Sequence, residues 1–185
     1  PKDLPSNDRM IADAKDMVRR LTVLRDAPVV DPYTGPAILS GPASGVFFHE
    51  IFGHRIEGHR LKGGGETFKK KVGELVLPAD FQVYCDPTLR GYAGEELNGF
   101  YLYDDQGVKA RRVYVVKDGV LREFLMSRVP LDGFPRSNGH GRTAGGGDPV
   151  SRQSNLVVET TAPHSEAELR SMLIEEAKKQ GKEYG

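Results

Sequence analysis

Five short segments between residues 75 and 125 constrain the fold of this chain most strongly, because each has the composition of a β-strand and turn-forming residues separate them. They lie at 75–77, 81–85, 99–103, 112–116 and 120–125. Asp118-Gly119, between the last two, is a pair that tight hairpins favour. Connections this short join antiparallel strands. The sequence therefore predicts antiparallel hairpins, followed by a last strand at 156–159.

The two ends of the chain are predicted to be helical. Residues 7–24 place apolar side chains at alternating steps of four and three residues, which is the pattern of an amphipathic helix. Near the other end, Ser165 and Glu168 have the spacing of a capping box. A helix is expected to start there and to run to about Gln180, before Gly181.

A third helix is predicted in the middle of the chain, from about Pro42 to about Leu61, after a short strand at 37–40. One of its faces carries several apolar side chains that can anchor it on a sheet. The fold class expected from these elements is α+β. It would consist of an antiparallel sheet, or barrel-like hairpins, packed with the N-terminal helix, the middle helix and the C-terminal helix.

The middle helix carries the pattern His49-Glu50-x-x-x-His54. Neutral imidazoles are good zinc ligands, and an adjacent glutamate can take a proton from the attacking water. The H-E-x-x-H pattern of zinc peptidases has its histidines four residues apart, whereas five residues along an α-helix turn a side chain by about 140°. A π-turn would bring both histidines to one face, and Gly53 would ease it. The alternative is that these are unconnected polar positions on an amphipathic helix.

Composition excludes several functions. The chain has 26 basic and 26 acidic side chains, and this formal net charge of zero argues against a general binder of nucleic acid. Its single cysteine rules out an internal disulfide and suits a reducing compartment. No apolar run approaches the roughly 20 residues of a membrane span. We expect a cytoplasmic protein that contacts no membrane and does not bind nucleic acid directly.

Together these motifs resemble the TldD/PmbA family of metallopeptidases, whose members are also called modulators of DNA gyrase. The resemblance rests on segments that occur in one order, at 49–58, 104–107, 137–142 and 149–155, followed by the last predicted helix. It implies that residues 37–185 are a central to C-terminal metallopeptidase region that is incomplete. Residues 1–36 would then be an N-terminal helix and linker.

The resemblance further implies that His49 and His54 are zinc ligands and that Glu50 is the general base. The family's third ligand is a cysteine in a Cys-Gly-rich segment near the C-terminus of the full-length proteins, and that segment is missing from this sequence. Cys85 does not match it, and we interpret Cys85 as a small buried hydrophobic residue. With two of three ligands, this piece is expected to hold zinc weakly or not at all and to be inactive alone.

Five further residues are candidates for the site. His140, Arg142 and Arg152 lie in Gly-rich loops, and we assign them to substrate binding because arginine suits a peptide carboxylate or carbonyl. For the two arginines, a structural ion pair is the alternative. Glu57 is either a carboxylate that orients a ligand histidine or a surface charge. His59 is either a further ligand or an exposed residue at the end of the helix.

The resulting hypothesis is a zinc-dependent peptidase that hydrolyses unfolded or modified peptides. The resemblance implies that it works as a homo- or heterodimer with a family member. The antiparallel sheet edges are expected to take an extended peptide by strand addition. The alternatives are a non-catalytic module that binds peptides or a partner protein, and a regulator associated with DNA gyrase. The neutral net charge counts against the last.

Overall fold

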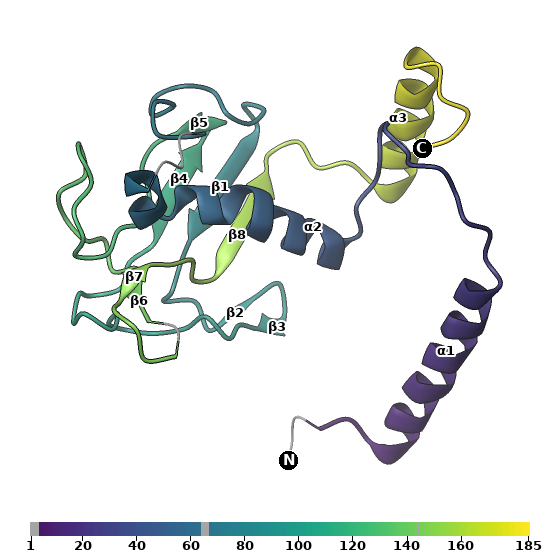
Figure 1. Ribbon diagram of the computed structural model, residues 1–185, viewed down its shortest axis with the longest axis horizontal. Coiled ribbons are helices and arrows are strands. Elements are labelled where there is room, and N and C mark those ends of the chain that lie inside the picture. Colours follow the sequence, from purple (N-terminus) through teal and green to yellow (C-terminus); the bar gives the residue numbers. More distant parts are fainter. Residues whose placement is uncertain (1–3, 64–66, 144) are drawn as a thin grey trace.

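The centre of the protein is a four-stranded antiparallel sheet in the order β5-β4-β1-β8 (Figure 1). The computed structural model describes residues 4–63, 67–143 and 145–185. The strands of the sheet are β1 (Phe81–Cys85), β4 (Val113–Lys117), β5 (Val120–Leu121) and β8 (Leu156–Thr160). The predicted α+β class with antiparallel pairing is confirmed. The sheet is open rather than barrel-like, and β8 lies at its edge within the described residues.

The β4–β5 hairpin forms where the Asp-Gly pair predicts it. Asp118 and Gly119 have φ values of 54° and 72°, and a type I′ turn requires positive φ at both central residues. A Cβ on Gly119 would also overlap the carbonyl oxygen of Leu77. Turn chemistry and this close approach together explain why glycine follows aspartate here.

Several predicted strands are absent or short. Residues 37–40 and 99–103 form no strand, and 75–77 contributes a single bridge to the sheet. Segment 99–103 has strand composition, but its backbone bonds to a loop, as when Tyr101 N donates to Pro87 O. Two ribbons that the sequence did not predict complete the β-structure. They pair β2 (Gly91–Tyr92) with β3 (Glu95–Glu96) and β6 (Gly141–Arg142) with β7 (Val150–Ser151).

The predicted middle helix consists of several kinds of helical turn. In order they are α2 (Gly41–Phe47), the π-turn η1 (Phe48–Phe52), and the 3₁₀ turns η2 (Gly53–Ile56) and η3 (Gly58–Lys62). The predicted π-turn is therefore confirmed. The prediction of a regular helix in the second half is wrong. Glu57 is extended there, with ψ of 105°, and forms a parallel bridge with Leu125. Hydrogen bonds from Leu125 N to Ile56 O and from Gly58 N to Leu125 O draw the chain onto the core at this point.

The core lies between these helical turns and the sheet. Ile56 and Leu61 from the turns pack with side chains of β1, β4 and the segment after β5. Burial of this apolar surface is the main force that fixes the turns on the sheet. The buried cluster is Phe52, Ile56, Leu61, Val83, Cys85, Val113, Val115, Val116, Leu121, Phe124, Leu125, Met126 and Leu131.

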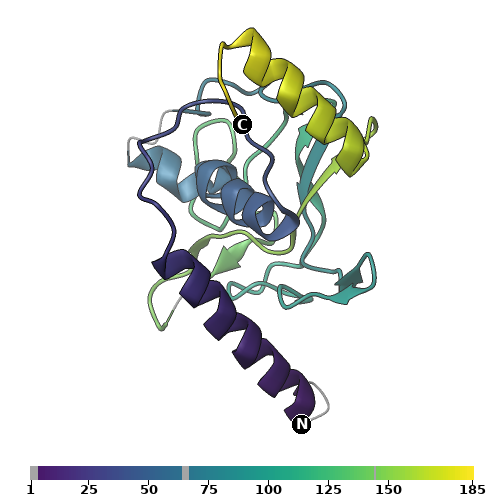
Figure 2. The same ribbon diagram turned by 90° about the vertical axis from the view of Figure 1, so that its right-hand side faces the viewer.

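The N-terminal helix α1 (Asn7–Arg25) forms as predicted, and Ser6 caps it. Its expected packing is wrong, because no residue of α1 is buried and its apolar side chains, such as Met17 and Leu24, are exposed. Figures 1 and 2 both show α1 standing away from the sheet at the end of an extended connection. The domain boundary at residue 36 stays a prediction.

The C-terminal helix α3 (Glu166–Lys179) starts at the predicted capping box, with Ser165 and Glu168 bonded reciprocally. The chain after α3 lies beside the connection that precedes α2. There Tyr33 stacks on Tyr184 with ring centroids 5.1 Å apart, and its hydroxyl donates to Tyr184 O at 2.8 Å. No helix within the described residues combines the length and apolar character needed to cross a membrane.

Candidate metal centre

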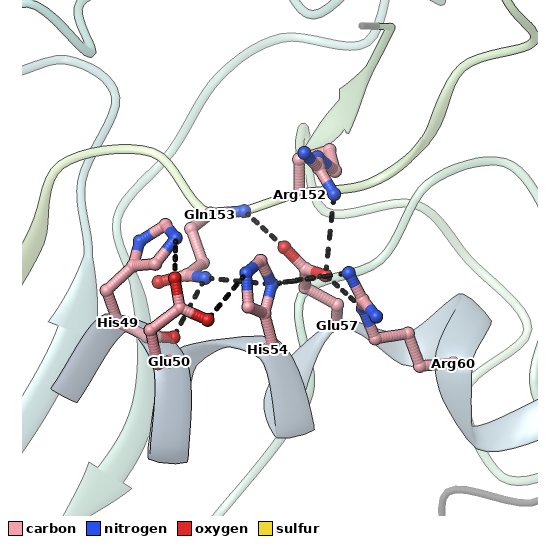
Figure 3. Close-up of polar contacts among 7 residues, drawn as sticks. All are labelled: His49, Glu50, His54, Glu57, Arg60, Arg152 and Gln153. Atoms are coloured by element: carbon pink, nitrogen blue, oxygen red, sulfur yellow. Dashed lines mark hydrogen bonds and ion pairs between the residues drawn. The ribbon is translucent and has the colours of Figure 1, made fainter. Parts of the chain in front are cut away.

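The π-turn brings His49 and His54 together (Figure 3). Their ring centroids are 4.6 Å apart and the ring planes meet at 74°. On a regular α-helix these side chains would point about 140° apart. The wider turn at η1 removes that difference, and the spacing that departs from H-E-x-x-H is thereby accommodated.

Glu50 lies between the two imidazoles. Its Oε1 is 3.8 Å from His49 Nε2, and its Oε2 is 3.8 Å from His54 Nε2. One ligand atom from each of these residues lies within 4.8 Å of the other two. Ligand atoms around tetrahedral zinc, with bonds of about 2.0–2.1 Å, are about 3.4 Å apart. Small side-chain rotations would therefore bring the two imidazole nitrogens onto one ion with the Glu50 carboxylate beside it, and imidazole donors fit zinc.

The cluster is accessible from outside. The Glu50 side chain is 60% exposed and that of His49 is 50% exposed, whereas His54 is 23% exposed. A hollow of about 530 Å³ lies on the His49 side, between α2 and β8. A second hollow, of about 320 Å³, is lined by Glu50 and His54. A molecule could thus approach the cluster from either side.

Glu57 is the buried anchor of the site. Its side chain is 1% exposed, and its Oε2 is 3.1 Å from His54 Nδ1. A carboxylate can only accept, so this contact places the His54 proton on Nδ1 and leaves Nε2 free to bind a cation. Glu57 Oε2 also accepts from Arg60 Nε at 2.6 Å, and Arg152 Nη1 lies 3.9 Å away. The two positive charges offset the cost of burying the carboxylate. Glu57 is therefore not a surface charge.

The predicted substrate-binding residues lie in different places. Arg152 is beside Glu57 (Figure 3). Arg142 is in an ion pair with Asp105 at 2.8 Å and lies over the ring of Tyr101, which matches the structural alternative.

His140 is fully buried, so it offers no surface to a substrate in this arrangement. Its Nδ1 is 3.3 Å from Asn138 O, and its Nε2 is 3.2 Å from Ser154 Oγ. Burial lowers the pKa of His140 to about 4. The neutral ring is a structural element that the sequence pattern alone did not distinguish from a substrate contact.

His59 and Cys85 do not join the cluster of His49, Glu50 and His54. His59 is partly buried rather than exposed; its Nδ1 has no hydrogen-bond partner within the described residues, and burial lowers its pKa. Cys85 is in the core, and burial raises the pKa of its thiol to about 12. A thiol that stays protonated is a poor metal ligand, which agrees with the interpretation of Cys85 as a small hydrophobic residue.

Two residues of the site were missed by the sequence reasoning. Arg60 bonds Glu57 from one turn away, and Gln153 reaches the site from the link between β7 and β8. Gln153 belongs to the segment 149–155, for which the family resemblance gives a motif but no role for this residue. Nothing in its local pattern indicated a contact with a segment about a hundred residues away.

Comparison with known proteins relates this chain to a protein family. A model described as the PmbA/TldA metallopeptidase C-terminal domain matches residues 32–179. A metalloprotease of Archaeoglobus fulgidus is 33% identical over 123 residues, which cover 66% of this chain and 28% of that protein. A metalloprotease of Methanocaldococcus jannaschii is 32% identical over 122 residues, covering 65% and 26%. The chain thus spans about a quarter of the length of these curated relatives.

Solved structures share the fold. TldE from Thermococcus kodakarensis matches with a TM-score of 0.56 and 20% identity, over 85% of this chain and 36% of that one. A Thermotoga maritima protein named as a candidate modulator of a DNA gyrase matches with a TM-score of 0.54 and 21% identity, over 68% and 27%. At these identities the likeness concerns the fold.

Proposed function

The chain belongs to the PmbA/TldD metallopeptidase family, and on that premise we propose that the turn from His49 to His54 is the zinc site of a peptidase. The observation that carries the proposal is the convergence of two imidazoles and Glu50 across a π-turn. When bound, zinc would supply a Lewis acid that polarises the scissile carbonyl and acidifies the attacking water. His49 and His54 would hold it through Nε2.

Glu50 is proposed as the general base. It lies 3.8 Å from both imidazole Nε2 atoms, and its side chain is largely exposed, so it can turn toward a water that attacks a peptide bound from the open side. Glu50 would accept a proton from that water as its oxygen bonds to the carbonyl carbon. It would then donate the proton to the amide nitrogen of the leaving peptide as the C–N bond breaks.

Glu57 would act through His54. By accepting from Nδ1–H it fixes the tautomer and the ring orientation, which is the usual role of a carboxylate behind a ligand histidine. Arg60 and Arg152 hold that carboxylate in place. Arg152 is also the predicted substrate-binding residue that we retain, because it is at the site and about one third exposed.

A third protein ligand is proposed to come from a downstream cysteine. Catalytic zinc normally has three protein ligands and one open position, and Cys85 lies in the core. We therefore propose that the 185 residues alone bind zinc weakly and do not cleave peptides. A 1:1 zinc complex of this chain that survives dialysis against a chelator would contradict this.

The substrate is proposed to be an extended, unfolded or modified peptide. Strand β8 pairs only with β1 among the described strands, so its outer edge can pair with a peptide. The hollow of about 530 Å³ lies along this strand and is lined by His49, Leu156 and Val158. A strand added to β8 would therefore pass close to the histidines.

We also propose that the protein works as a dimer, with a second copy or another family member. Support comes from the apolar side chains that α1 and α3 leave exposed, such as Leu24 and Ile174, since such surface is often covered by a partner. The single buried cysteine agrees with a reducing compartment, and we propose the cytoplasm.

The test is cleavage of an unstructured peptide by the complete, zinc-loaded protein, with wild type beside Glu50→Gln. We expect the variant to bind zinc like the wild type and to lose about 10²–10⁴-fold in rate, as expected when a general base is removed. Equal cleavage by both would refute the role of Glu50. If neither cleaves but both bind the peptide equally, the non-catalytic binding module becomes the better description.

A further inference from the structure

Gln153 contacts both histidines of the proposed metal centre and Glu57 behind them. Its backbone N–H donates to Glu57 Oε1 at 3.4 Å, and its side-chain Nε2 donates to the backbone oxygen of His49 at 3.4 Å. The same Nε2 lies 3.4 Å from His54 Nδ1. Figure 3 shows the side chain passing between the two histidines. One residue from the β7–β8 link thus contacts His49 within the π-turn and His54 just after it.

The Gln153 side chain packs directly against Gly53, where the absence of a side chain leaves room for it. A Cβ at position 53 would lie 2.8 Å from Gln153 Nε2 and would overlap its Oε1 and Cδ. The backbone of Gly53 is helical, with φ of −58° and ψ of −46°, so any residue could adopt it. Glycine is therefore needed at position 53 because Gln153 approaches it closely. The backbone conformation at this position does not require glycine.

Packing alone does not account for a glutamine at this position. Its Oε1 is buried without a hydrogen-bond partner among the described residues, and an unpaired buried acceptor destabilises the fold. A methionine of similar length would fill the space without that cost. What glutamine adds is a donor to the His49 carbonyl inside the π-turn.

The turn needs such support because it decides the histidine geometry. π-turns are rare and the same residues would form an α-helix with His49 and His54 on different faces. We propose that Gln153 is a positioning residue that locks the π-turn and so sets the separation of the two imidazoles. This inference rests on the proposed zinc site and adds a residue to it that touches neither zinc nor substrate.

The experiment measures zinc affinity in the complete protein, by competition with a chromophoric chelator, for wild type and Gln153→Met. We expect zinc binding about 10–100-fold weaker in the variant, the usual cost of losing an outer partner of a ligand. The absorption spectrum of the cobalt(II) form should change as well. The urea midpoint of the metal-free protein should stay equal or rise, because the unpaired Oε1 is gone. Gln82→Met, a partly buried glutamine on β1 that bonds Asp118, is the matched control and should leave zinc affinity unchanged.

A second set of variants tests the contact with Gly53. Gly53→Ala should weaken zinc binding in the wild-type background, because the new Cβ displaces the Gln153 amide. In a Gln153→Ala background the same change should have no further effect. Additive losses would contradict the mechanism.

Two results would overturn the inference by itself. One is zinc binding by Gln153→Met within twofold of the wild type. The other is a lowered urea midpoint with an unchanged cobalt spectrum, which indicates support of the fold only. A wild-type protein without zinc affinity would instead refute the proposed function, and this inference with it.

Discussion

Acid should destabilise the folded protein through one buried histidine. His140 has no exposed surface and its Nδ1–H donates to Asn138 O, so the folded state holds the ring neutral, with a pKa of about 4. In the unfolded chain a histidine has a pKa of about 6.5. Between these values the unfolded chain binds a proton that the folded chain does not. The contribution of neutral His140 to the free energy of unfolding is therefore fully present above pH 6.5 and is lost as the pH falls toward 4.

The size of the effect follows from the two pKa values. A difference of roughly 2.5 units corresponds to about 3 kcal/mol, at about 1.4 kcal/mol per unit. With a urea m-value of about 2 kcal/mol per molar, the midpoint should fall by about 1.5 M between pH 7 and pH 4 from this residue alone. Unfolding curves at steps across this range, with a chelator present to keep metal off the other histidines, measure it.

The comparison with His140→Gln isolates the residue. The variant should be less stable at pH 7, because Gln replaces a packed ring. Between pH 7 and pH 4, however, its free energy of unfolding should fall by about 3 kcal/mol less than that of the wild type. The exposed His164 provides the matched control, since His164→Gln should follow the wild-type curve. Parallel curves for wild type and His140→Gln would refute the reasoning and would mean that the ring is solvated or charged in the folded state.

Three other substitutions test the structure. Glu57→Ala should lower the free energy of unfolding by about 2–3 kcal/mol in urea titrations, less than for a fully buried pair because Arg60 is half exposed; a loss below 1 kcal/mol would contradict the burial of this carboxylate. Gly45→Leu should keep fold and zinc, since a Cβ there meets nothing within 4 Å, but should fill the hollow beside His49 and slow peptide cleavage about tenfold; unchanged cleavage would exclude the hollow from the substrate path. Phe124→Ala should cost about 3–5 kcal/mol by thermal unfolding, and a near-neutral result would count against the core described above.

Local chemistry explains which elements could be predicted from the sequence. The Asp118-Gly119 turn and the Ser165–Glu168 capping box are specified by residues a few positions apart, and both form. The π-turn was predictable for a related reason: only a widened turn lets histidines five residues apart share one face.

Contacts between distant segments were beyond the same reasoning. Residues 99–103 have strand composition, yet their backbone partners lie in loops, so no strand forms. The extended backbone of Glu57 depends on Leu125, which no helical pattern around residue 57 could reveal. The sequence around His140 suggested a substrate contact, and the sequence around Gln153 suggested no role. Contacts with distant segments determine that His140 is buried and that Gln153 reaches His49.

The separation of α1 from the sheet has a consequence for how the chain melts. Most of the stability of a protein helix comes from packing of its apolar face. Helix α1 has charge pairs along its surface, such as Arg9–Asp13 and Asp16–Arg20, instead of a packed face. In the monomer, its helix–coil equilibrium should follow salt and temperature independently of the rest. In hydrogen-exchange measurements, amides of residues 7–25 should exchange through local fraying, whereas those of β1 and β4 should exchange only through global unfolding.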